Sequence, residues 1–438
     1  MYERSSPFSS HARHAVRVLL KEVSEDGCAG ASGSLPAPRT RGYPREVRTA
    51  VYLLVVLTAG AYLPTPLYPA YQHAFGFSDL TLTLVYALFA LVSAPALLLF
   101  GPASDALGPR TVLRISVGMA ALASGCFALA QGQVWLLVGR AAQGLALGAA
   151  TGAATALITE HARGRNRAKA STLASMAFVA GTAAGPIAAG ALAQYAPAPQ
   201  VLPYLVHLVL LAVGWQRVSA LTAPASRMRR WRPTRPHIPS GIRPLFATAA
   251  ASGFLAWTVA GLFLAVIPAV LSREADINNL AIIGGIVGAV LTCSVLSQPL
   301  VARCGTYRTQ LAGLGALLAS LGALAVTGGG LVLVTVIAAM AAGTGHGLAY
   351  GGAAAAIDAA APPGNRAAIN SALHLAFYLG AGGPAVAVGL LSIWHSLATA
   401  VSWLSIGTAV LVPLVAVAIA LGNRPVQEQP LSQGRTAP

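Results

Sequence analysis

The 438-residue chain is strongly apolar: 56% of its residues are hydrophobic, only 9% are Asp, Glu, Lys or Arg, and its mean hydropathy is +0.68. A soluble protein carries about a quarter charged residues, so this composition excludes a water-soluble globule. The formal net charge of +16 would suit a nucleic-acid-binding surface, but the positions of the basic residues, given below, indicate membrane topology instead.

Apolar runs of roughly 18 or more residues, each long enough to cross a hydrocarbon core of about 30 Å as a helix, recur along the chain. The alternating pattern of a membrane barrel is absent. Prolines inside the runs are compatible with helices, because neighbouring helices satisfy the backbone groups that a membrane proline frees. The sequence predicts an all-α membrane protein with twelve transmembrane helices, near residues 49–71, 80–100, 111–130, 134–158, 168–193, 200–221, 244–270, 279–300, 309–328, 331–357, 367–391 and 396–421.

The distribution of basic residues predicts the orientation. With twelve spans, alternate loops lie on opposite sides of the bilayer. Of the 28 Lys and Arg residues, only Arg273 falls in the loops of one side, and only Arg140 lies deep inside a span, because Arg114, Lys169 and Arg217 lie within about a turn of the cytoplasmic ends of theirs. Because basic loops stay cytoplasmic, we expect both termini in the cytosol of a cell whose inner or plasma membrane holds the chain. The positive charge then reflects topology, and no nucleic-acid partner is expected.

The polar ends carry no targeting or metal signal. Residues 1–47 lack the apolar core of a signal peptide, so we expect a disordered cytoplasmic tail there and a second cytoplasmic tail at 422–438. The four cysteines are scattered, without a Cys/His cluster. Neither a disulfide framework nor a metal or other cofactor is therefore expected.

The chain also contains an internal repeat. "RNRAKASTLASMAF" at 165–178 matches "GNRAAINSALHLAF" at 364–377, and a Gly-Pro pair follows in both segments. The repeat predicts two pseudo-symmetric six-helix bundles at 48–221 and 244–421, joined by the Arg- and Pro-rich linker 222–243. Such repeats are typical of secondary transporters, whose binding site lies near mid-membrane between the halves.

Three motifs indicate a family. The stretch "GPASDALGPRTVLR" at 101–114 combines glycines, which allow a tight turn, with a carboxylate suited to a helix N-terminus. It resembles the loop 2–3 signature of the major facilitator superfamily through Gly101, Asp105, Gly108 and Arg110. The resemblance implies that Asp105 contacts the start of span eleven, near Asn365 and Arg366, as a conformational latch between the halves. Ala106 stands where the family has a basic residue, so fewer ion pairs are expected.

Spans four and five also resemble the family. "LLVGRAAQGLALG" carries Arg140, Gln143 and Gly144, and the cost of an intramembrane Arg, at least about 2.5 kcal/mol, implies a wet cavity or a partner for Arg140. "GTAAGPIAAG" resembles the antiporter-associated segment through Gly181, Gly185, Pro186 and Gly190. Plain packing of small residues is the alternative reading of that segment.

Candidate contacts for a solute or proton are Tyr62, Trp257, His346 and Tyr350, together with Arg140 and Gln143. No carboxylate lies at the middle of a span, so His207, His346 and His374 are the titratable candidates, and His346 is the best placed. A buried histidine without a transport role is the alternative.

These features predict a carrier that exports a small organic compound, drug-like or metabolic, by alternating access with proton antiport, as in multidrug efflux. We expect it to work as a monomer. An uncoupled facilitator or an importer with the same fold remains the alternative. No catalytic motif occurs in any span, so the chain is not expected to be an enzyme, and no large soluble domain suggests a receptor or scaffold.

Overall fold

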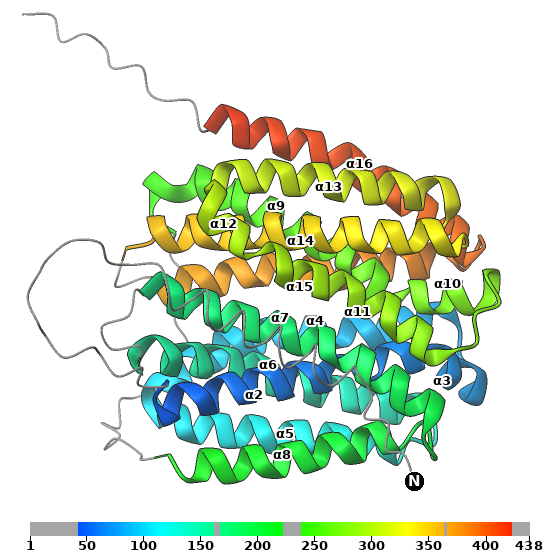
Figure 1. Cartoon of the computed structure of the whole chain (residues 1–438), viewed down its shortest axis with the longest axis horizontal. Helices are drawn as coiled ribbons and strands as arrows, with labels where there is room; N and C mark the ends of the chain where they lie inside the picture. The colour runs from blue at the N-terminus through cyan, green and yellow to red at the C-terminus, as the bar shows by residue number, and fades with distance from the viewer. Residues whose placement is uncertain (1–42, 162–166, 222–237, 363–365, 423–438) are drawn as a thin grey trace, which may run out of the picture. The chain divides into compact units, whose positions relative to one another are not determined.

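In the computed structural model, residues 43–161, 167–221, 238–362 and 366–422 are described, and all belong to one unit, residues 43–438. Every regular element among these residues is a helix (Figure 1), which confirms the predicted all-α class. The predicted tails and most of the predicted linker lie outside the described residues. The division of the chain into two bundles therefore remains a prediction.

Among the described residues 43–161 and 167–221, the first part of the chain contains eight helical elements. They are α2 (Arg45–Tyr62), η1 (Thr65–Leu67), α3 (Tyr68–Phe75), α4 (Asp79–Leu107), α5 (Pro109–Ala128), α6 (Gln133–His161), α7 (Arg167–Tyr195) and α8 (Leu202–Ser219). The prolines at 64, 66 and 69 interrupt the first predicted span as the short turn η1. Helix α4 runs to Leu107, so the stretch after residue 100, which the sequence suggested was a loop, is helical. The turn is confined to Gly108.

The second part contains nine elements in its described stretches, 238–362 and 366–422. They are η2 (Ser240–Ile242), α9 (Arg243–Ala265), α10 (Ile267–Glu274), α11 (Leu280–Ser297), α12 (Pro299–Cys304), α13 (Thr306–Thr327), α14 (Val332–Ala360), α15 (Arg366–Leu391) and α16 (Leu397–Gly422). Pro268 and Pro299 stand within the first two residues of α10 and α12, where a missing N–H costs nothing.

Eleven helical segments of the described residues are long and apolar enough to cross a membrane. Twelve were predicted, so the count is not confirmed in full. The remaining candidate is the 18-residue α8, whose His207, Gln216 and Arg217 lower its hydropathy. Apolar side chains are exposed along several helices, most extensively on α16, as expected of surfaces that face lipid tails: Trp403, Ile406, Val410, Leu411, Leu414 and Val417.

Matching glycines define the close helix contacts in the two parts. Gly144 and Gly148 of α6 face α4, where an added Cβ would lie 2.8 Å from the Phe89 carbonyl oxygen and 2.7 Å from that of Ser93. Gly343 and Gly347 of α14 face the backbone of α11 in the same manner. Small residues four apart allow such close approach. These paired contacts are what an internal duplication predicts.

A second match lies at the turn after α4 and at the turn after α12. Gly108 has φ 82° and Gly305 has φ 80°, a region that glycine adopts without the strain of a Cβ. Each glycine directly precedes a long helix, α5 or α13. Between the two parts, α4 contacts α15 and α7 contacts α11, so the site described next is built from both.

Candidate functional site

Arg140 is completely buried on α6 and is held without a carboxylate partner among the described residues. Its Nη1 donates to the Ala61 carbonyl oxygen at 2.5 Å and to Gln143 Oε1 at 2.9 Å, and its Nη2 donates to the Tyr68 hydroxyl. The guanidinium carbon also lies 5.5 Å from the Phe89 ring centroid, within cation–π range. The positive charge is therefore solvated by neutral oxygens and aromatic faces rather than neutralised.

Gln143 and Gly144 hold this arrangement in place. The Gln143 side chain accepts from Arg140 and donates from Nε2 to the Gly60 carbonyl oxygen at 2.9 Å. Gly144 allows α6 to approach α4, where a Cβ would lie 2.9 Å from Val92 Cβ. The three residues that the sequence singled out in span four thus lie together. Because Arg140 is enclosed by protein groups in this structure, any contact with a solute requires rearrangement.

A second buried polar group lies on α14. His346 Nδ1 is 2.8 Å from the Ser294 hydroxyl of α11. The imidazole packs against two rings: it stacks on Tyr350, with centroids 5.2 Å apart, and meets Trp257 edge to face. His346 Nε2 and the Trp257 indole nitrogen are both buried and have no hydrogen-bond partner among the described residues. Buried polar groups are nearly always paired, so these two nitrogens are candidates for binding a solute or water.

A narrow cavity lies between helices of the two parts of the fold. It is lined by side chains from α2, α7, α9, α14 and α15: Tyr62, Phe178, Trp257, Tyr350, His374, Phe377, Tyr378 and Ala381. Its free volume of about 10 Å³ is close to the minimum that one water needs, so the aromatic side chains are almost in contact. Three of the four predicted solute contacts line it, and His346 packs behind Trp257 and Tyr350.

Of the remaining lining residues, the sequence analysis named His374 as a titratable candidate and missed the other four, although one signal was present. Phe178 and Phe377 stand at matching positions of the repeat, and both face this cavity. Tyr378 meets Phe89 edge to face at 6.4 Å, which connects the cavity to the ring layer around Arg140. His374, whose Nδ1 is 2.8 Å from the Asn370 carbonyl oxygen, carries the imidazole on the cavity wall.

The segment of α7 that resembles the antiporter motif packs against two helices. Gly181 and Gly185 face α2, where an added Cβ would overlap Val55 and Ala59 carbonyl oxygens. Gly190 instead faces α11, where an added Cβ would lie 3.1 Å from the Gly284 Cα. Gly284 in turn packs against the Pro186 carbonyl oxygen. The motif therefore places α7 between one helix of its own part and one of the other.

The predicted latch lies largely outside the described residues. Nothing is described of the Asp105 side chain, of residues 363–365 or of the Arg366 side chain, so that contact stays a prediction. Arg110 donates to the Ser219 carbonyl oxygen at the end of α8, and Arg114 Nη2 donates to the Ser219 hydroxyl at 2.8 Å. The structure thus places the Arg110 side chain, which belongs to α5, against the C-terminal end of α8.

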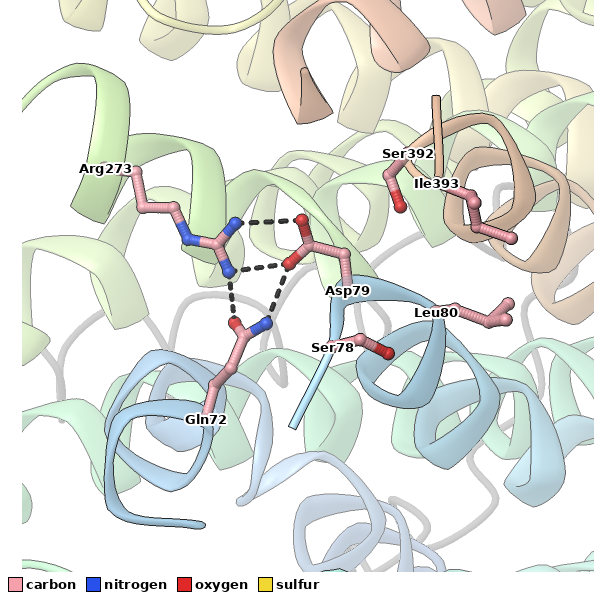
Figure 2. A pocket seen from close by; sticks show the side chains of 7 residues that line it. All are labelled: Gln72, Ser78, Asp79, Leu80, Arg273, Ser392 and Ile393. Atoms are coloured by element: carbon pink, nitrogen blue, oxygen red, sulfur yellow. Dashed lines mark hydrogen bonds and ion pairs between the residues drawn. The ribbon is translucent and has the colours of Figure 1, made fainter. Parts of the chain in front are cut away.

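At the opposite ends of the helices, three polar side chains form a ring that the sequence did not predict (Figure 2). Arg273 Nη1 donates to Asp79 Oδ2 at 2.9 Å, and Arg273 Nη2 donates to Asp79 Oδ1 at 2.6 Å and to Gln72 Oε1 at 2.6 Å. Gln72 Nε2 closes the ring by donating to Asp79 Oδ1 at 2.7 Å. The ring borders a cavity of about 350 Å³, lined in addition by Ser78, Leu80, Ser392 and Ile393.

No cluster of three or more His, Cys, Asp or Glu side chains suited to a metal occurs among the described residues. The buried groups instead offer hydrogen bonds, one fixed cation and a continuous aromatic surface. Such a site can bind a small molecule and can hold or pass a proton at an imidazole.

Comparison with known proteins identifies the family. The chain belongs to the Major Facilitator Superfamily, whose family model matches residues 51–384, and it is a membrane transporter by fold. Among the curated proteins, none matches the chain.

Solved structures match over most of the chain. A bacterial homolog of the human lysosomal transporter Spinster, inward-facing and unoccupied, gives a TM-score of 0.60 at 16% identity, covering 87% of this chain and 97% of that one. The occupied form gives 0.59 at 17%, covering 86% and 95%. The nucleoside transporter NupG gives 0.64 at 12%, covering 87% and 100%. At these identities the likeness shows the fold alone.

Proposed function

We propose that this chain is a secondary active transporter that exports a small organic compound by alternating access, in exchange for protons. The observation that carries the proposal is the aromatic cavity between the two parts of the fold. It is lined by helices of both parts and backed by two buried nitrogens without partners. A solute bound there would contact both halves, as alternating access requires.

The chemistry of the cavity supports an amphipathic, largely aromatic solute that is neutral or anionic. Tyr62, Trp257 and Phe377 offer ring faces and few polar atoms, so a free sugar, which has no aromatic ring to stack on them, would leave its hydroxyl groups unpaired, whereas the base of a nucleoside could stack. The uncompensated charge of Arg140 lies behind this surface and disfavours an organic cation at short range in a low-dielectric site. The unpartnered Trp257 N–H is suited to a solute with a hydrogen-bond acceptor.

Export against protons is supported by two features. The α7 segment from Gly181 to Gly190 resembles the antiporter-associated pattern. His346 is a buried imidazole with one free nitrogen, and imidazole is the side chain that ordinarily titrates near neutral pH. We assign binding of the coupled proton to His346. We assign to Arg140 the positive potential that disfavours cations in the cavity.

The test uses the full chain reconstituted into liposomes that contain the pH indicator pyranine. Three probes of different charge are supplied: ethidium, a permanent aromatic cation; uridine, a neutral nucleoside; and anilinonaphthalene sulfonate, a permanent aromatic anion. We expect uridine or the sulfonate to cross with an opposing proton movement, and ethidium not to cross. Transport of ethidium alone would overturn the assigned solute class.

An uncoupled facilitator or importer is the second candidate, because the described spans carry carboxylates only near their ends. The same liposomes separate the two. If an imposed pH gradient does not change the direction or extent of probe movement, the chain is a facilitator. If collapse of the gradient abolishes accumulation, the antiport proposal stands.

A further inference from the structure

The ring formed by Gln72, Asp79 and Arg273 joins the two parts of the fold (Figure 2). Gln72 on α3 and Asp79 at the start of α4 belong to the first part, whereas Arg273 in the last turn of α10 belongs to the second. All three hydrogen bonds that the Arg273 guanidinium makes here are accepted by side chains of the first part. The ring therefore exists only while α3 and α4 lie against α10.

Other contacts at the same helix ends also cross between the parts. The backbone N–H of Leu280, at the start of α11, donates to Gln194 Oε1 of α7 at 2.8 Å. Gly389 of α15 lies against Thr83 of α4, where an added Cβ would overlap the threonine hydroxyl. The structure is thus closed at this end. By the distribution of basic residues it is the end predicted to face outward.

We infer that the Gln72–Asp79–Arg273 ring is an outer gate, which stabilises the outward-closed state and breaks when the carrier opens outward. The inference rests on the alternating access proposed above. An interaction present in one state and absent from the other shifts the equilibrium between them by its full worth. Removing either partner of the ring therefore raises the population of the outward-open state.

The accessibility of the ring sets the size of the effect. The Arg273 side chain is 43% exposed and that of Asp79 is 17% exposed, and the ring borders the 350 Å³ cavity. Both charges can therefore exchange their partner for water during opening. An exposed ion pair contributes modestly to the free-energy difference between the closed and open states. The two-pronged Arg–carboxylate geometry increases that contribution. We expect loss of the pair to raise the open-to-closed ratio about fivefold, so that the gate biases the carrier without locking it.

The test measures distances between two outer loops that do not belong to the ring. Gln131 lies between α5 and α6, and Leu331 lies between α13 and α14, both exposed. Cysteines at these positions, in a background whose four native cysteines are serine, carry spin labels for double electron–electron resonance. Asp79→Asn and Arg273→Ala should each increase the long-distance population relative to the short one about fivefold. Arg273→Lys, which keeps the charge but loses the two-pronged geometry, should give a smaller increase.

Two further variants complete the design. Glu274→Gln changes an exposed charge next to Arg273 that takes no part in the ring's hydrogen bonds, and it should leave the distances unchanged. The exchange Asp79→Arg with Arg273→Asp should restore part of the short-distance population. Unchanged distances in both Asp79→Asn and Arg273→Ala would overturn the gate.

The spin-label readout needs no solute, so it separates the gate from the proposed function. If no probe is transported but Asp79→Asn shifts the distances, the gate stands and the assigned solute class and coupling fail. If probes are exchanged for protons while neither single variant shifts the distances, the proposed function stands and the ring is not a gate.

Discussion

Trp257 and His346 pack edge to face, with ring centroids 4.6 Å apart and planes at 89°, and each keeps a buried nitrogen without a partner. Leaving a buried polar group unpaired costs about 1–3 kcal/mol. A solute that pairs with one of these nitrogens would recover that free energy on binding. We therefore expect both the solute and the coupled proton to bind at the Trp257–His346 pair.

The indole nitrogen can be tested by Trp257→Phe, which keeps an aromatic face and removes the N–H donor. We expect the KM for a transported acceptor-containing probe such as uridine to rise about tenfold, corresponding to one lost hydrogen bond in a dry site. The maximal rate should change much less. Trp403→Phe is the matched control, because Trp403 is exposed on α16. Equal effects of the two substitutions would remove Trp257 from solute recognition.

His346 is tested by His346→Leu, which fills the space but cannot carry a proton. The Ser294 hydroxyl loses its partner, so we expect a lower melting temperature by a few degrees. If His346 carries the coupled proton, probe movement should also lose its response to an imposed pH gradient while downhill movement persists. Pyranine in the liposomes reports the proton, and the solute is followed by the fluorescence of the sulfonate or by radiolabelled uridine.

His207 offers the contrasting case of a buried histidine. Its Nδ1 is 2.7 Å from the Ser124 hydroxyl and its Nε2 is 3.0 Å from the Val56 carbonyl oxygen, so both nitrogens are occupied by protein groups. We expect His207→Leu to lower the melting temperature without altering the dependence of transport on the pH gradient. A loss of coupling in both variants would mean that the effect of His346→Leu is structural.

Helix positions and much of the site could be predicted from sequence, because they depend on features that lie within a single helix. Long apolar runs determine which segments become helices in a bilayer. Arg140 was recognisable as the one basic residue deep inside a span, and glycines four apart marked the close helix contacts. The repeat makes Phe178 and Phe377 equivalent positions, and both line the same cavity, although neither was singled out from the sequence.

The features that were missed depend on contacts between distant segments. Asp79 and Arg273 are 194 residues apart, and nothing local to either residue identifies the other as its partner. Tyr378 is a single side chain on a helix whose neighbours decide what it faces. The glycine and proline after residue 100 suggested a loop, whereas α4 continues to Leu107 because a bilayer helix tolerates both residues.

Arg140→Lys tests whether the fixed cation needs its geometry as well as its charge. A lysine ammonium cannot reproduce the planar set of contacts to Ala61, Gln143 and Tyr68, so the Gln143 amide oxygen would lose a donor. We expect transport of uridine or the sulfonate to fall at least tenfold, with a smaller loss of thermal stability than in Arg140→Gln. Normal transport in Arg140→Lys would show that charge alone suffices, and normal transport in Arg140→Gln would remove Arg140 from the mechanism.

The contact between α7 and α11 gives a further test of outward opening. A side chain at Gly190 would overlap the Leu280 carbonyl oxygen, whereas one at Gly285, on the same pair of helices, meets no neighbouring atom within 4 Å. Overpacking typically costs about 1–3 kcal/mol. Gly190→Val therefore raises the free energy of the closed arrangement alone. We expect the outer labels at 131 and 331 to separate in Gly190→Val, with the long-distance population rising roughly tenfold. Gly285→Val, which has the same effect on helix propensity, should leave the distances unchanged. If Gly190→Val instead lowers the melting temperature without separating the labels, α7 and α11 stay together throughout the transport cycle, and the opening must occur elsewhere.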